Sequence, residues 1–239
     1  ALNLYFYSPK AYKYVKTIIP LPHPSLLRKW SSSVDCEPGF SKEAFTALAS
    51  EVRRNAIKKD CCLIIDAMAI QKKTIWEQKR DRYVGFVDYG KDGPVLDDPD
   101  TLASEAHAFL FVGTKSHWKC PIGYFLTDKI ASTNQTQLIK MALELAADAG
   151  LKNWSITADG TSVNFSTFEQ LGCRFGTTFH SFETKFQHPT TGEDVFIIAE
   201  PCHMLKLARN TLAFLGTIID KEDEEIQWNY FKQLHILQE

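Results

Sequence analysis

Several common signals are missing from this sequence. It has no apolar run approaching the roughly 20 residues of a membrane span, and its start does not resemble a secretory signal. None of its six cysteines falls in a Cys-x-x-Cys pair, so a structural zinc site has little support. With a net charge of −2 it has no overall basic field, so any nucleic-acid contact must come from a local patch. We therefore expect no membrane partner and no structural zinc site.

The remaining composition is that of a folded protein. Of the 239 residues, 44% are hydrophobic and 12% aromatic, which is enough to fill a sizeable core. Cys61 and Cys62 are adjacent in a predicted strand and would face opposite sides, so we expect buried, reduced thiols rather than a disulfide. Because the chain begins with Ala1 rather than Met, we expect it to be a piece of something longer.

The first 57 residues have a helical pattern. Ser8 can cap a helix over Pro9–Ile19, and Ser25–Trp30 is a second short helix. A polar linker over Ser31–Gly39 follows, and Ser41 then caps a third helix. We predict a small helical segment of helix-turn-helix type.

From about residue 60 the pattern changes to that of strands alternating with helices. Five strands are expected: Cys61–Ile70, Arg82–Tyr89, an interrupted or bulged strand made of Ala106–Thr114 and Ile122–Thr127, Trp154–Ala158, and Val195–Ala199. Helices are expected over Asn134–Ala149, Val163–Leu171 and Pro201 to about Leu215.

The order of these elements indicates a fold class. Three antiparallel strands are followed by a helix, a strand, a helix, a strand and a helix, which is the plan of a ribonuclease H-like fold. We predict an α/β protein of the α+β kind, with a five-stranded mixed sheet and flanking helices. A Rossmann sheet is less compatible, because no Gly-x-Gly-x-x-Gly follows the first strand, and no Gly-x-x-x-x-Gly-Lys phosphate loop is present either.

Two apolar runs in the expected strands each end in an aspartate, and these two residues are the candidate catalytic site. Asp66 follows Cys61–Ile65, and Asp159 follows Trp154–Ala158. Open α/β sheets bind ligands at strand ends, and carboxylate oxygens are the ligands that Mg²⁺ prefers. Paired metal ions can promote an in-line phosphoryl displacement, so the pattern predicts a site for Mg²⁺ or Mn²⁺. The alternative is that each aspartate only caps a turn, which Asp159-Gly160 does well.

Glu200 and the helix after it are further candidates. Glu200 ends the fifth strand and is a possible extra metal ligand; alternatively, it sits at a helix N-terminus that favours a carboxylate. The helix then carries His203, Lys206, Arg209 and Asn210 as a polar, partly basic stripe. This stripe is predicted to face DNA, the alternative being an ordinary solvated surface.

Four ordered segments resemble the P-element-type DNA transposases, which include the THAP-domain transposase-like proteins. They are Ile65–Ile70, Trp118–Phe125, Thr157–Gly160 and Pro201–Asn210, and the pieces around Tyr7–Tyr12 and Leu21–Ser25 are similar as well. The resemblance covers essentially the whole chain. It implies a nuclear enzyme that cuts and joins DNA with an Asp, Asp, Glu triad and Mg²⁺.

The resemblance also implies an organisation. Residues 1–57 would be the helical segment, 58–215 an incomplete ribonuclease H-like catalytic domain, and 216–239 the start of an insertion domain. Asp66 and Asp159 match the first two acids, and the third would follow the insertion, beyond Glu239. Family members often have Asp at the position of Glu200. GTP is implied only for the full-length protein, which is expected to form homo-oligomers on transposon ends and target DNA.

Two functions follow from these expectations. The first is the core of a cut-and-paste DNA transposase, with metal-dependent phosphodiester cleavage and strand transfer. The second is a domesticated, inactive relative that serves as a DNA-binding or protein-interaction module. Asp66 and Asp159 argue for the first function, because an interaction scaffold has no need of them.

Overall fold

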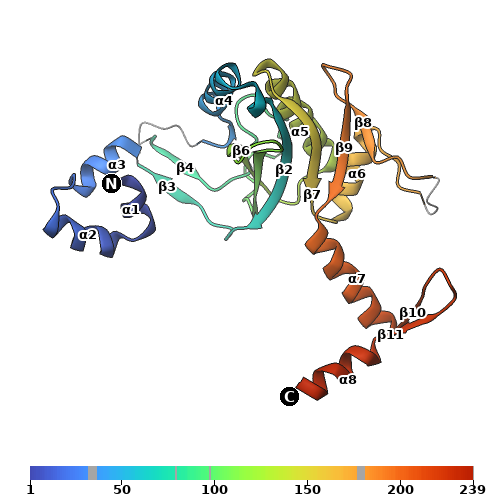
Figure 1. Cartoon of the computed structure of the whole chain (residues 1–239). Helices are drawn as coiled ribbons and strands as arrows, with labels where there is room; N and C mark the ends of the chain where they lie inside the picture. Colours follow the sequence, from blue (N-terminus) through green and yellow to red (C-terminus); the bar gives the residue numbers. More distant parts are fainter. Residues whose placement is uncertain (32–36, 79, 97, 177–180, 239) are drawn as a thin grey trace. The chain divides into compact units, whose positions relative to one another are not determined.

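The computed structural model describes residues 1–31, 37–78, 80–96, 98–176 and 181–238, and Figure 1 shows the whole chain. The chain forms two compact units, Ala1–Glu37 and Pro38–Glu239. Most of the expected linker over Ser31–Gly39 and the thiol of Cys36 lie outside the described residues.

The first unit consists of three short helices, α1 (Leu2–Tyr7), α2 (Pro9–Ile18) and α3 (Pro24–Ser31). The side-chain oxygen of Ser8 accepts a hydrogen bond of 3.1 Å from the backbone N–H of Ala11, which confirms the expected cap of α2. Tyr12 is fully buried and donates its hydroxyl proton to the Pro22 carbonyl at 2.7 Å. This bond ties α2 to the segment that enters α3.

The second unit is built on a seven-stranded mixed sheet with the order β1-β6-β5-β2-β7-β9-β8. Its strands are β1 (Gly39–Phe40), β2 (Asp60–Ala69), β5 (Glu105–Gly113), β6 (Lys119–Thr127), β7 (Lys152–Ala158), β8 (Lys185–Gln187) and β9 (Asp194–Ala199). The β2–β7 and β7–β9 pairs are parallel, and the other pairs are antiparallel. The five central strands form the predicted ribonuclease H-like sheet.

Three helices pack on one face of this sheet: α4 (Lys42–Arg54), α5 (Ser132–Asp148) and α6 (Ser162–Leu171) (Figure 1). Alternate strand residues face these helices and form the core, including Leu63, Ile65, Phe109, Phe111, Ile156 and Val195. Each such side chain contributes about 1.5–3 kcal/mol when fully buried. Phe45 and Leu48 of α4 belong to the same core, so α4 joins the sheet, although residues 1–57 were expected to form one helical segment.

Two of the five expected strands were assigned to the wrong segments. Only Arg82–Val84 of Arg82–Tyr89 is a strand, β4, and it pairs with β3 (Ile75–Glu77) in a separate hairpin. The expected interrupted strand is instead two antiparallel strands, β5 and β6, that reverse direction between Gly113 and Lys119. An apolar run broken by a polar turn has the same sequence pattern as a bulged strand, and only pairing tells them apart.

A β-bulge sets the register between the two parallel central strands. Cys61 pairs with Asn153, but Cys62 pairs with Ser155, so Trp154 is an extra residue on β7. Without the bulge, Asp66 would lie level with Ala158. Continuing the observed register from the Ile64–Thr157 pair by two residues places Asp66 level with Asp159 instead, on the same face.

The bulge is anchored by a buried carboxylate. The indole N–H of Trp154 donates to Asp60 Oδ1 at 2.6 Å, and Lys115 Nζ lies 2.8 Å from Asp60 Oδ2. Asp60 is only 2% exposed. The hydrogen bonds from Lys115 and Trp154 lower the pKa of this carboxyl group.

The C-terminal part begins with α7 (Pro201–Leu215), as predicted. It continues with the hairpin β10 (Thr217–Ile219) and β11 (Glu225–Gln227), and ends with α8 (Asn229–Gln238). No helix in the described part of the chain has the length and apolar character needed to cross a bilayer.

We expect Asp60→Ala to lower the free energy of unfolding by about 1–3 kcal/mol at pH 7, because it leaves the Trp154 N–H without its acceptor. The contribution of a carboxyl with a lowered pKa is present above its ordinary value of 3.8 and is lost as the pH falls through the lowered one. The difference between wild type and variant should therefore shrink in acid. Urea unfolding at pH 7 and at successively lower pH values below 3.8 measures both effects.

Trp154→Phe is the second single variant of a double-mutant cycle, since it removes the donor of the same hydrogen bond. The double variant should lose less than the sum of the two single losses. Fully additive losses would contradict a shared anchor.

Candidate metal and nucleic-acid site

Asp66 lies within β2, at the point where the strand loses one of its two neighbours. The pairing of β2 with β7 ends at Ile64, while the pairing with β5 continues through Asp66 to Ala69. Asp66 is exposed, and it lies on the opposite face from the buried Ile65. Its Oδ1 accepts a hydrogen bond of 2.9 Å from the backbone N–H of Ala67. The carboxylate is thus available on the face that α4, α5 and α6 do not cover.

Asp159 follows the last residue of β7 and is half-buried. Its Oδ1 accepts hydrogen bonds from the Asn164 amide at 2.6 Å and from the Thr161 N–H at 3.2 Å. The second bond is the Asx-type turn expected for Asp159-Gly160. Among the described residues, Oδ2 accepts no hydrogen bond, so one carboxylate oxygen remains for a ligand.

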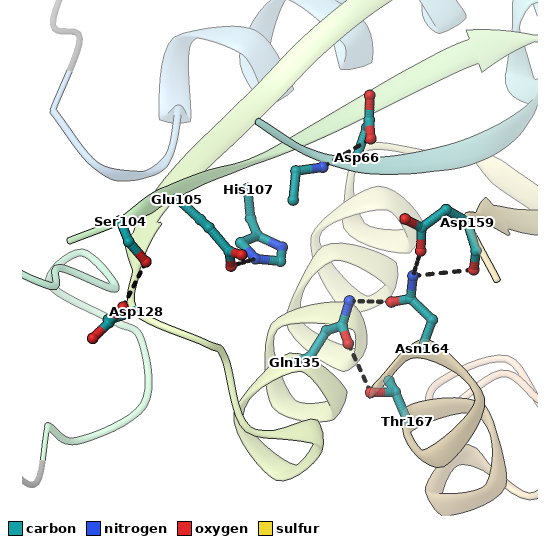
Figure 2. A network of polar contacts seen from close by, with 10 residues as sticks. Asp66, Ser104, Glu105, His107, Asp128, Gln135, Asp159, Asn164 and Thr167 are labelled. Carbon is teal, nitrogen blue, oxygen red and sulfur yellow. Dashed lines mark hydrogen bonds and ion pairs between the residues drawn. The ribbon is translucent and has the colours of Figure 1, made fainter. Parts of the chain in front are cut away.

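The structure therefore brings the two predicted acids to one edge of the sheet on adjacent strands (Figure 2). Their oxygens are the donor set that a hard divalent cation takes. The described residues contain no group of three or more His, Cys, Asp or Glu side chains placed to hold a metal. The residues present thus fit part of a metal site, namely two carboxylate ligands.

Glu200 acts as the N-cap of α7. Its two carboxylate oxygens accept the backbone N–H groups of Cys202 and His203. These bonds, that from His203 above all, lower the pKa of Glu200. The carboxylate already has the partners of a helix cap, which was the alternative to a metal ligand, and its predicted role in a metal site stays a prediction.

The predicted basic stripe lies on α7. Lys206, Arg209 and Asn210 are exposed, and His203 is half-buried. The Arg209 guanidinium donates to Asn210 Oδ1 at 2.7 and 3.2 Å, which orders the two side chains together. The stripe begins close to the acidic edge, because Glu200 N–H donates to the Ala158 carbonyl at 2.9 Å.

A small polar group lies beside the site on β5 and its neighbours. His107 Nε2 is 3.3 Å from Glu105 Oε2, and Ser104 donates to Asp128 at 2.5 Å (Figure 2). The His107 Nδ1 atom is buried and has no hydrogen-bond partner among the described residues. His107 pairs with Ala67 and faces the helices, so its side chain lies on the other face of the sheet from Asp66.

The sheet order, its flanking helices and the two acids define a ribonuclease H-like domain. Residues 36–172, more than half of the chain, match the family model "TNP-like, RNase H N-terminal domain". Residues 1–30 match "Transposable element P transposase-like, HTH domain", and residues 202–239 match "TNP-like, GTP-binding insertion domain". The chain belongs to the P-element-type transposase family.

Two relatives agree with this assignment. The chain is 31% identical over 212 residues to the human protein "DNA transposase THAP9", covering 88% of the chain and 23% of that protein. Its fold is similar to the "Drosophila P element transposase strand transfer complex", with a TM-score of 0.75 and 20% identity, over 98% of this chain and 47% of the other. The chain therefore spans less than half of the length of either relative.

One charge pattern went unnoticed in the sequence. Residues 1–30 contain no Asp or Glu, while Lys10, Lys13 and Lys16 recur on α2 at three-residue spacing and Arg28 and Lys29 lie on α3. The whole-chain net charge of −2 conceals this basic unit. Counting charge over each segment separately would have revealed it.

We expect Glu200→Ser to keep the N-cap of α7 and leave Mn²⁺ binding unchanged, because serine also caps helices but carries no carboxylate. Glu200→Ala, which removes the cap, should lower the melting temperature by about 2–4 °C at pH 7. That difference should fade as the pH falls through the lowered pKa of Glu200, since protonation ends its capping. Loss of Mn²⁺ binding in a well-folded serine variant would instead make Glu200 a metal ligand.

Proposed function

We propose that this chain is the core of a DNA transposase that cleaves and joins phosphodiester bonds with Mg²⁺ or Mn²⁺ held by Asp66 and Asp159. The observation that supports the proposal is the register of β2 and β7, because continuing it two residues beyond the last pair, Ile64–Thr157, brings Asp66 level with Asp159. The names of the matching family and of the human relative support the same class of reaction.

The two aspartates have distinct tasks in this reaction. Asp66, which is exposed, would be the ligand shared by the ions, and Asp159 would offer Oδ2, the oxygen that accepts no hydrogen bond among the described residues. A bound divalent ion supplies activation of the attacking oxygen and stabilisation of the leaving oxygen. Two carboxylates are an incomplete set, so we expect the 239-residue chain alone to show little nuclease activity.

DNA is the partner that the charge pattern supports. The stripe of His203, Lys206, Arg209 and Asn210 starts beside the acidic edge, where it would hold a phosphate backbone near the metal. The first unit, cationic and free of acidic residues over 1–30, would add further phosphate contacts. In the whole protein we propose transposon ends and target DNA as substrates, a homo-oligomeric assembly, a nuclear location, and a role for GTP in the insertion domain.

A domesticated DNA-binding or protein-interaction module is the second candidate. The observation in its favour is that the described residues contain no third carboxylate gathered with Asp66 and Asp159. If the longer protein nicks DNA and carries a glutamate on a helix beyond residue 239, the transposase function is supported over the non-catalytic module.

We expect Asp66→Asn and Asp159→Asn each to weaken Mn²⁺ binding by more than about tenfold, because each removes a charged ligand. Mn²⁺ titration of the chain, followed by water-proton relaxation, measures this directly. Asp148→Asn, at the exposed end of α5, is the matched control and should bind as wild type does. Unchanged affinity in Asp66→Asn or Asp159→Asn would remove the basis of the proposal.

Reversing charge on the stripe should weaken DNA binding regardless of sequence. We expect Lys206→Glu and Arg209→Glu each to lower affinity and to reduce the slope of log K against log salt by about 1. Lys140→Glu, which changes an exposed lysine on α5, should change neither quantity. Equal effects of all three substitutions would show that only total charge matters, and that α7 is a solvated face.

A further inference from the structure

A row of buried side chains leads from Asp159 into the interface of α5 and α6 (Figure 2). Asn164 Nδ2 donates to Asp159 Oδ1 at 2.6 Å, and Asn164 Oδ1 accepts from Gln135 Nε2 at 2.7 Å. Gln135 Oε1 in turn accepts from the Thr167 hydroxyl at 2.8 Å. Asn164, Gln135 and Thr167 are 9%, 2% and 0% exposed.

The direction of this chain of hydrogen bonds is fixed from its ends. A carboxylate can only accept, so Asn164 must turn its NH₂ group to Asp159 and its oxygen to Gln135. Gln135 must then donate to that oxygen and accept from the Thr167 hydroxyl. Each bond polarises the next in a region closed to water, so the amide that faces Asp159 is a stronger donor than an isolated one.

We infer that Gln135, Asn164 and Thr167 form a relay that positions Asp159 for metal binding, with Gln135 and Thr167 acting without touching the metal. Asn164 also donates to the Asp159 carbonyl at 3.2 Å, so it holds both the backbone and the carboxylate of this residue. Because Oδ1 is held, Oδ2 is the oxygen that accepts no hydrogen bond among the described residues. The inference rests on the proposed function, because it takes Asp159 as a metal ligand.

The same helix pair supplies a second polar contact that serves as a control. The Thr136 hydroxyl shares its proton between the Ser132 carbonyl at 2.7 Å and Gln170 Oε1 at 3.1 Å, and Gln170 Nε2 donates to the Ser132 hydroxyl oxygen at 2.7 Å. This contact also joins α5 to α6, but none of these bonds reaches Asp159. If the relay merely held the two helices together, damage to either contact would have the same consequences.

The test is Mn²⁺ titration of the whole chain, followed by water-proton relaxation, with Gln135→Glu as the main variant. The carboxylate that this substitution introduces can only accept from Asn164, so the Asn164 amide must flip and turn its oxygen toward Asp159. We expect the Mn²⁺ dissociation constant to rise about 10- to 100-fold, the range seen when an outer partner of a metal ligand is lost. Gln135→Leu, which does not force the flip, should raise it much less.

Thr136→Val is the control for the helix interface and should leave Mn²⁺ binding as in wild type, while Thr167→Val should weaken it. Thermal unfolding of every variant separates binding from stability. If Gln135→Glu fails to fold, Asn164→Leu removes the donor directly and should weaken Mn²⁺ binding by a similar factor.

The outcomes separate the two proposals. Wild-type Mn²⁺ affinity in folded Gln135→Glu or Asn164→Leu, with binding still lost in Asp159→Asn, overturns the relay and leaves the metal site standing. An equal loss of Mn²⁺ affinity in Thr136→Val and Thr167→Val also overturns the relay, because the effect would then come from the helix interface as a whole. Unchanged binding in Asp159→Asn overturns the proposed function itself.

Discussion

The hydrogen bond between Trp154 and Asp60 is the interaction on which the candidate site depends. It fixes the extra residue of the β7 bulge at the start of the strand, and every later pair along β2 and β7 inherits that register. A strand alternates its faces with a period of two, so a slip of one residue would turn Asp159 away from the face of Asp66. The two acids are aligned by a contact made at the opposite end of the strands from where they lie.

Parallel pairing explains why the two acids lie toward the same end of their strands. Chain connections after β7 and β9 leave the sheet, into α6 and α7, whereas β2 runs on beside β5 alone. The strands thus diverge just where Asp66 and Asp159 are placed. The α6 helix that leaves from this point then supplies Asn164, so the chain segment that ends the strand pairing also provides the hydrogen-bond partner of Asp159.

The sequence was sufficient for the fold class because its long elements have strong patterns. The periodic apolar face of α5, the run before Asp66 and the Pro201 start of α7 each pointed to one structure, and the order of elements did the rest. It failed for β5 and β6 because a turn between two apolar segments and a bulge within one strand look alike. The seven strands include β1 and β8, two or three residues long, which are too short for periodicity to detect.

The candidate site, like the fold, was predictable from the sequence only in part. Asp66 and Asp159 could be selected from the sequence, since an acid directly after an apolar run is a local pattern. The alignment of these two acids depends on the β7 bulge, which the sequence pattern does not show. The support of Asp159 depends on Gln135, which lies on α5 rather than on α6 and looks in the sequence like any other polar residue of that helix. Burying a polar side chain costs free energy unless its hydrogen bonds are made. Both amide atoms of the buried Gln135 make hydrogen bonds, and these bonds orient Asn164 and, through it, Asp159. That burial is visible only once the helices are packed.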